Sequence, residues 1–169
     1  KSYASLVYGW QWGWRIENTG LPVQLSANRA INCGWSYTIN STGTVNVAYD
    51  MWLHTNPNPD YSTTPTDEVM VWLHRAGGAG PISSGNPVRV TIGGAEWDLH
   101  RGFTTLNVFS YVRVQNAATA VLNMNDFMRD LQTRGWLQSS KYLASIQAGT
   151  EVYTGTGTLT THGFYCRIQ

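Results

Sequence analysis

The chain has 169 residues, with 11 Lys and Arg against 10 Asp and Glu, and it contains no basic run and no acidic tail. The chain therefore lacks the clustered positive charge that is typical of nucleic-acid-binding and membrane-surface proteins. No apolar run reaches the length of a membrane span. Gly, Thr, Asn, Ser and aromatic residues are abundant, which is typical of β-rich, secreted proteins. We expect one domain over residues 1–169 that is extracellular and monomeric and has no nucleic-acid or membrane partner.

Alternation of apolar and polar residues predicts that most of the chain forms β-strands. Turn signals rich in Asn, Gly and Pro separate the apolar runs, for example TNPNPD and RAGGAGP. The predicted strands cover residues 2–12, 32–39, 44–54, 67–74, 88–94, 95–102, 106–114, 142–155 and 161–169. Many short strands of this kind favour an all-β protein, either a β-sandwich or a jelly roll.

The first predicted strand contains the stretch YGWQWGW, which holds three of the eight tryptophans. In a regular strand Trp10, Trp12 and Trp14 point to one face. That face is either part of the core or a platform for a planar ligand. A bulge at Gly9 or Gly13 would turn part of the set into the core.

One segment departs from the alternation. Residues 122–136 carry apolar side chains at helical spacing, namely Met124, Phe127, Met128 and Leu131. Asn123 is the expected N-cap, and Gly135 is the expected C-terminal stop. We therefore predict a single helix here that packs its apolar stripe on the core.

Three predicted strands place an acidic residue beside an aromatic residue on the face opposite their apolar strip. Asp50 shares its face with Trp52, and Glu68 shares its face with Trp72. Glu151 follows the same pattern in the strand that starts at residue 142, provided that no bulge interrupts it. Aromatic rings stack on sugars, and paired carboxylates cleave glycosidic bonds. The pattern therefore favours a glycosidase.

The other candidate site residues have simpler explanations. Asp67 faces away from Glu68 and is expected to be a surface acid at a strand end. Glu96 and Asp98 share a face of a short strand, where we expect a solvated hairpin. The four histidines are widely spaced, without a metal-binding motif, so we expect no metal site and no cofactor.

Two cysteines, Cys33 and Cys166, lack any metal-type spacing. They form either one disulfide or two buried thiols, and the sequence leaves both possibilities open.

Four segments, NVAYDMWLH, TPTDEVMVWL, AGPISSG and SIQAGTEVYTGTGTL, resemble those of glycoside hydrolase family 12 in order and in composition. That family consists of endo-acting β-1,4-glucanases, some of them specific for xyloglucan. The resemblance runs along essentially the whole chain. It implies a jelly-roll β-sandwich of two curved antiparallel sheets with one packed helix and an open cleft on the concave side.

The resemblance also implies roles for the three acids. Glu68 matches the family's nucleophile, Glu151 its acid/base and Asp50 its supporting carboxylate. The implied reaction is a double displacement with retention, for which the two working carboxyls lie roughly 5–5.5 Å apart.

A further set matches residues that line the family's cleft and would contact a β-glucan chain. These residues are Trp10, Trp12, Met70, Trp72, Pro81 and Tyr153. Trp14 has no counterpart, and we expect it to be a loop anchor packed on the cleft rim.

The chain begins after the point where family members carry further strands, including a tryptophan-bearing segment that binds sugar. We therefore expect a single catalytic domain that is N-terminally incomplete relative to the family. Two alternatives stay open. A non-catalytic carbohydrate-binding β-sandwich would explain the tryptophans equally well, and an inactive fragment would fail to fold.

Overall fold

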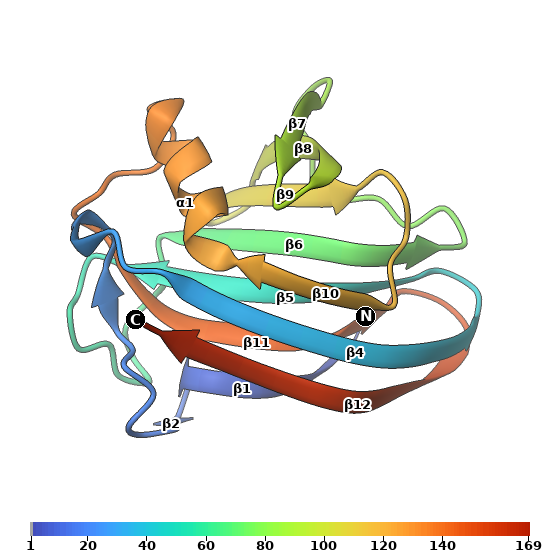
Figure 1. Ribbon diagram of the computed structural model, residues 1–169, viewed down its shortest axis with the longest axis horizontal. Coiled ribbons are helices and arrows are strands. Elements are labelled where there is room, and N and C mark those ends of the chain that lie inside the picture. The colour runs from blue at the N-terminus through green and yellow to red at the C-terminus, as the bar shows by residue number, and fades with distance from the viewer. Residues whose placement is uncertain (1) are drawn as a thin grey trace.

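The computed structural model describes residues 2–169 as two β-sheets packed face to face, with a helix beside them (Figure 1). The larger sheet has the strand order β2-β1-β11-β5-β6-β9-β8-β7, and β3 also pairs with β11. Its strands are β1 (Ser2–Gln11), β2 (Trp14–Arg15), β3 (Val23–Gln24), β5 (Val45–His54), β6 (Asp67–Ala76), β7 (Val88–Ile92), β8 (Ala95–Phe103), β9 (Asn107–Arg113) and β11 (Tyr142–Val152). The predicted all-β jelly-roll sandwich with one packed helix is confirmed.

The smaller sheet has the order β10-β4-β12, with β10 (Thr119–Asn123), β4 (Ile31–Thr42) and β12 (Thr156–Ile168). The expectation of purely antiparallel sheets needs one correction, because β6 and β9 pair in parallel in the larger sheet. After β6 the chain continues to β7, which lies at the edge of the sheet. β8 runs antiparallel to β7, and β9 runs antiparallel to β8, so that β9 lies beside β6 and parallel to it.

The sequence prediction missed three strands and the 3-10 turn Leu25–Ala27. β2 and β3 have only two residues each, which is too short for alternation to be detected. β10 has five residues, and its two buried apolar side chains, Ala120 and Leu122, run into the helix that follows. All nine predicted strands are present.

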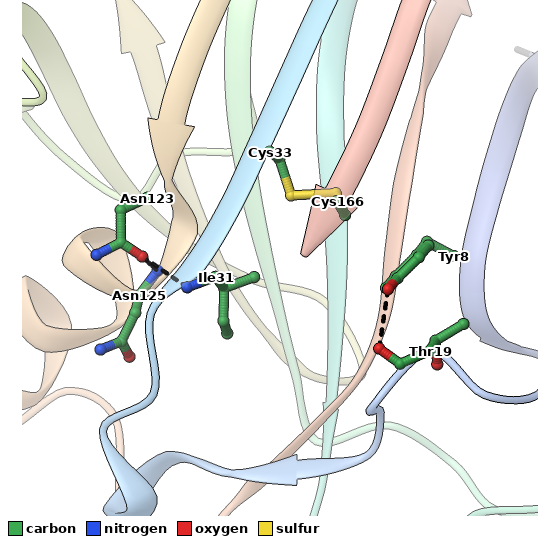
Figure 2. The surroundings of a disulfide bond; sticks show 7 residues. All are labelled: Tyr8, Thr19, Ile31, Cys33, Asn123, Asn125 and Cys166. Atoms are coloured by element: carbon green, nitrogen blue, oxygen red, sulfur yellow. Dashed lines mark hydrogen bonds between the residues drawn. A yellow bond between two sulfur atoms is a disulfide. The ribbon is translucent and has the colours of Figure 1, made fainter. Parts of the chain in front are cut away.

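The predicted helix is confirmed as α1 (Met124–Thr133). The side chain of Asn123 accepts a hydrogen bond from the Asn125 N–H, as an N-cap does. The same Oδ1 also accepts from the Ile31 N–H at 2.8 Å, which joins the start of α1 to β4 (Figure 2). Gly135 follows the helix with φ +71°, a conformation that suits glycine.

The main core lies between the two sheets and extends under α1. The apolar faces predicted for β5 and β6 both point into it. Trp35 of β4 meets Tyr49 of β5 edge to face, with ring centroids 5.3 Å apart. The opposite face of the larger sheet, called the outer face below, carries the three acids.

The two cysteines form a disulfide, which resolves the alternative that the sequence left open. Cys33 and Cys166 lie directly opposite each other in the β4–β12 pair, and both are buried. Figure 2 shows the bond joining these two strands of the smaller sheet.

Removal of the disulfide should destabilise the fold markedly. The bond closes a loop with a sequence separation of 133 residues. Loop-closure entropy of that size predicts that Cys33→Ala/Cys166→Ala lowers the free energy of unfolding by about 3–5 kcal/mol. Urea unfolding of the double variant and of the oxidised and reduced wild type measures this loss. An unchanged unfolding midpoint would contradict the expected stabilisation.

Candidate active site

Three neighbouring strands, β11, β5 and β6, carry Glu151, Asp50 and Glu68 on the outer face. Glu68 lies opposite Trp52 in the β5–β6 pair, and Asp50 lies opposite Met70. On the other side of β5, the backbone N–H of Glu151 donates to the Asn46 side chain at 2.9 Å. The strand order, rather than sequence proximity, brings the three acids together. They are called the carboxylate cluster below.

The electrostatics of two tyrosines supports this grouping. Tyr3 lies opposite Glu151 in the β1–β11 pair. Burial raises the pKa of Tyr3 well above its usual value, and the charges of Asp50, Glu151 and Glu68 raise it further. Burial also raises the pKa of Tyr153, with the hydrogen bond to Glu151 and the same three charges as further causes. Since all three acids act on both hydroxyls, the carboxylates share one region.

Glu151 is held firmly in place. It is 3% exposed, and its Oε2 accepts from Asn46 Nδ2 at 2.5 Å and from Tyr153 Oη at 2.6 Å. Because Asn46 also accepts from the Glu151 backbone, one amide side chain fixes both ends of the residue. A carboxyl oriented in this way is suited to proton transfer at one fixed position.

The other two acids differ in exposure. Asp50 is 4% exposed, whereas Glu68 is half-buried and is the most accessible member of the carboxylate cluster. Asp50 and Glu68 are diagonal neighbours across the β5–β6 pair, a position from which long side chains interact.

Met70 and Trp72 lie on the outer face, as alternation predicts, but they are only 5% and 1% exposed. They belong to a second, smaller apolar cluster with Ala79 from the loop after β6. Trp72 Nε1 lies 3.5 Å from Met70 Sδ. Their burial corrects the expectation of open contact residues, because these side chains form a covered wall beside the carboxylate cluster. Pro81 and Tyr153 are half-buried.

Four aromatic rings contact one another on the outer face, and one of them belongs to Trp52, the residue opposite Glu68. The rings of Trp10 and Trp12 are 4.9 Å apart, and Trp10 also meets His54 edge-on at 4.6 Å. Trp12 meets Trp52 at 6.1 Å. We call Trp10, Trp12, Trp52 and His54 the aromatic group.

Within this group, only part of the predicted stacking platform is accessible. Trp12 is 44% exposed, but Trp10 is 3% exposed, and its Nε1 donates to the Asp60 carbonyl at 3.2 Å. The expectation that Trp10 stacks directly on sugar is corrected by this burial. Trp10 supports the ring of Trp12 instead.

Gly9 explains why Trp10 leaves the core. Tyr8 packs against the main core, so strict alternation would bring Trp10 to the same side. Gly9 has φ +96°, and a Cβ at this position would lie 2.5 Å from the Ala144 carbonyl oxygen. This local kink turns Trp10 to the outer face. β1 ends at Gln11, and Trp14 lies in the two-residue strand β2 and is 54% exposed, so the expectation of a packed loop anchor was wrong.

A second irregularity affects β11, which pairs with both β1 and β5. The β5–β11 register shifts between Leu143 and Ser145, and Leu143 turns into the main core. Leu143 therefore does not share the face of Glu151, because a bulge of the kind that the prediction set as its condition interrupts the alternation here. The shift comes before Gln147, so the Glu151 end of the strand keeps its predicted orientation.

The expectation for Asp67 was wrong. Its side chain is fully buried, pairs with Lys141 and accepts from Asn107 Nδ2 at 3.0 Å. Asn107 belongs to β9, which pairs with β6, and alternation cannot show such a contact.

The expectation of a solvated hairpin at Glu96 and Asp98 is confirmed. Arg89 of β7 pairs with Asp98 at 2.8 Å and with Glu96 at 3.7 Å, both on β8.

Three residues of the outer face were missed from the sequence. Tyr3, Asn46 and His54 are uncharged, and nothing near them in the sequence marks them as site residues. Asn46 and His54 share the alternation face of Asp50 in β5, so a list of face neighbours would have included them, whereas Tyr3 lies in β1, which carries no acid. Within residues 2–169 no group of three His, Cys, Asp or Glu residues could hold a metal ion. The helix in this range is too short and too polar to cross a membrane.

His54 should make the fold sensitive to acid. It is fully buried, its ring nitrogens have no hydrogen-bond partner among residues 2–169, and burial lowers its pKa from 6.5 to about 4. The unfolded chain therefore binds a proton first, so this stability is present above pH 6.5 and is lost as the pH falls towards 4. The expected loss is about 3 kcal/mol. Urea titrations at pH 7 and pH 4 should show a smaller loss for His54→Phe, and equal losses would contradict this account.

Comparison with known proteins agrees with this arrangement. Residues 9–169 match the family described as Glycosyl hydrolase family 12. Endoglucanase S of Pectobacterium parmentieri is 40% identical over 166 residues, which cover 93% of this chain and 62% of that protein. A probable xyloglucan-specific endo-beta-1,4-glucanase A of Aspergillus terreus is 36% identical, over 97% of this chain and 62% of that protein. The chain thus spans about 62% of the length of these relatives.

Solved structures show the same fold. The family 12 xyloglucanase from Bacillus licheniformis matches with a TM-score of 0.96 and 37% identity, over 100% of this chain and 75% of that one. Endoglucanase cel12A from Rhodothermus marinus matches with a TM-score of 0.92 and 27% identity, over 99% of this chain and 74% of that one. The chain belongs to glycosyl hydrolase family 12.

Proposed function

We propose that the chain is an endo-acting β-1,4-glucan hydrolase that retains anomeric configuration and acts on xyloglucan or a cellulose-type glucan. The observation that carries the proposal is the carboxylate cluster, which places three acids from adjacent strands beside exposed and half-buried aromatic rings. The names of the two relatives, an endoglucanase and a xyloglucan-specific endo-beta-1,4-glucanase, support this substrate class.

The roles follow from exposure and hydrogen bonding. Glu68 is the most accessible acid of the carboxylate cluster, and it attacks the anomeric carbon as a carboxylate. Glu151 gives its proton to the leaving oxygen, while Asn46 and Tyr153 hold it in place. Glu151 then accepts a proton from a water molecule while the water oxygen attacks the anomeric carbon, which displaces Glu68 from the sugar and frees the product. Asp50, beside Glu68, supports the nucleophile.

The disulfide supports a place of action outside the cell. Disulfides persist in oxidising environments and are rare in the cytosol. Polysaccharide substrates are too large to enter a cell intact, which agrees with a secreted enzyme.

Hydrolysis of soluble xyloglucan and mixed-linkage glucan tests the proposal. We expect viscosity to fall faster than reducing ends appear, as internal cleavage requires, and NMR of the first product to show the β-anomer. Glu96→Gln is the control variant. It should keep full activity, because Glu96 is an exposed acid of the β7–β8 hairpin. Binding without hydrolysis by folded wild-type protein would favour a carbohydrate-binding module instead.

A further inference from the structure

A separate pocket lies beside the aromatic group, between the β1–β2 turn and the loop that follows β5. Its volume is about 260 Å³, and its walls include Trp10, Trp14, Arg15, Asn58 and Tyr61. Pockets for drug-sized ligands measure about 300–1,000 Å³, so this one suits a smaller molecule such as a single sugar ring.

Two of the side chains that line the pocket are large aromatic rings that lie outside the core. Trp14 is 54% exposed and Tyr61 is 76% exposed, whereas Trp10, which belongs to the aromatic group and also lines the pocket, is buried. Exposed rings around a hollow are a poor use of apolar surface unless something covers them. Sugar rings have flat apolar faces that stack on such side chains.

The pocket is preformed by contacts between its two walls. Arg15 Nη1 donates to Asn58 Oδ1 at 2.6 Å, and Trp10 Nε1 donates to the Asp60 carbonyl at 3.2 Å. These bonds join segments more than 40 residues apart and hold the two walls of the pocket together. A site fixed before binding loses little conformational entropy when it is occupied.

The charged side chains at the pocket already have partners within the protein. Arg15 pairs with Glu17 at 2.7 Å. The Asp60 carboxylate accepts from Ser62 N at 2.8 Å, Ser62 Oγ at 2.7 Å and Thr63 Oγ1 at 3.1 Å. Because Arg15 already has an ion-pair partner and the Asp60 carboxylate already accepts three hydrogen bonds, the pocket favours a neutral ligand with hydroxyl groups over an ionic one.

The pocket is also connected to the carboxylate cluster. Gln11, which lines the pocket, accepts from Gln147 Nε2 at 3.3 Å. Gln147 lies directly opposite Asp50 in the β5–β11 pair. The wall of the pocket is therefore in direct contact with a residue that neighbours the carboxylate cluster.

We propose that this pocket binds one neutral sugar ring of the polysaccharide substrate, stacked between Trp14 and Tyr61. The proposal rests on the proposed function for the identity of the polysaccharide. The ring is either a branch sugar or a backbone sugar at the far end of the bound chain, and both have the same hydroxyl-rich chemistry.

Calorimetric binding to Glu68→Gln protein, with and without Trp14→Ala or Tyr61→Ala, tests the pocket. The probes are a xylose-branched gluco-oligosaccharide and an unbranched cello-oligosaccharide of the same backbone length. We expect each pocket variant to weaken binding about tenfold. A loss with the branched probe alone assigns the pocket to a branch, and an equal loss with both assigns it to the backbone. Phe103→Ala, which removes a 67% exposed ring elsewhere on β8, should change nothing.

Wild-type affinity of both pocket variants for both probes would overturn the proposal. Because Trp14 and Tyr61 are exposed, unchanged thermal transitions should show that the variants are folded. The hydrolysis assay separates this result from a failure of the proposed function. Hydrolysis by the wild type together with binding that ignores Trp14 overturns the pocket alone. Trp14-dependent binding without hydrolysis overturns the hydrolase alone.

Discussion

Glu68→Gln should reduce kcat on β-glucan by about 10⁴-fold or more, because no covalent glycosyl-enzyme can then form. The substitution keeps the size of the side chain and removes only its charge. Glu68 is half-buried, and the cross-strand pair with Trp52 does not depend on that charge. The thermal transition should therefore stay within a few degrees of the wild type.

Initial-rate kinetics on xyloglucan measures this loss, with Glu96→Gln as the control that should keep full activity. Retention of more than about a tenth of the wild-type kcat by Glu68→Gln would contradict the nucleophile assignment. Substrate affinity should change little, since the aromatic group is left intact.

Glu151→Gln should lower kcat on polysaccharide by about 10²–10⁴-fold, the usual contribution of general acid–base catalysis. The loss should shrink for the first chemical step on aryl glycosides with acidic leaving groups, because such groups depart without a proton. Asn46 and Tyr153 both donate to Oε2 of Glu151, so the neutral amide disturbs two hydrogen bonds.

Stopped-flow measurement of the released phenol distinguishes the two glutamates. Glu151→Gln should give a rapid burst with a dinitrophenyl glycoside, followed by slow turnover, whereas Glu68→Gln should give no burst. A burst from Glu68→Gln would exchange the two assignments.

The sequence predicted the part of the fold that depends on alternation. The acids of β5 and β6 share a face with Trp52 and Trp72 because both strands keep a strict period of two up to those residues. The helix was predictable for a similar reason, since its stripe, its Asn123 cap and Gly135 are all local signals.

The sequence could not predict contacts that strand pairing creates. Asp67 is buried because Lys141 and Asn107, from distant segments, reach it in the folded sheet. Asn46 and Tyr3 join Glu151 only through the β5–β11 and β1–β11 pairs.

Backbone irregularities explain the remaining differences. The positive φ of Gly9 moves Trp10 to the outer face, and the shift at Leu143 moves that residue into the core. Strict alternation would put Trp10 on the core side with Tyr8 and Leu143 on the face of Glu151, and period-two reasoning detects neither a kink at a glycine nor a register shift.

The most direct test of a retaining mechanism through Glu68 is to trap the covalent intermediate. A 2-deoxy-2-fluoro cello-oligosaccharide with an activated leaving group should inactivate the protein and add one glycosyl unit to its mass. Peptide mapping should place that unit on Glu68, within residues 67–76. Inactivation with the sugar on another residue, or turnover of this reagent with no adduct and with inverted product, would contradict the account.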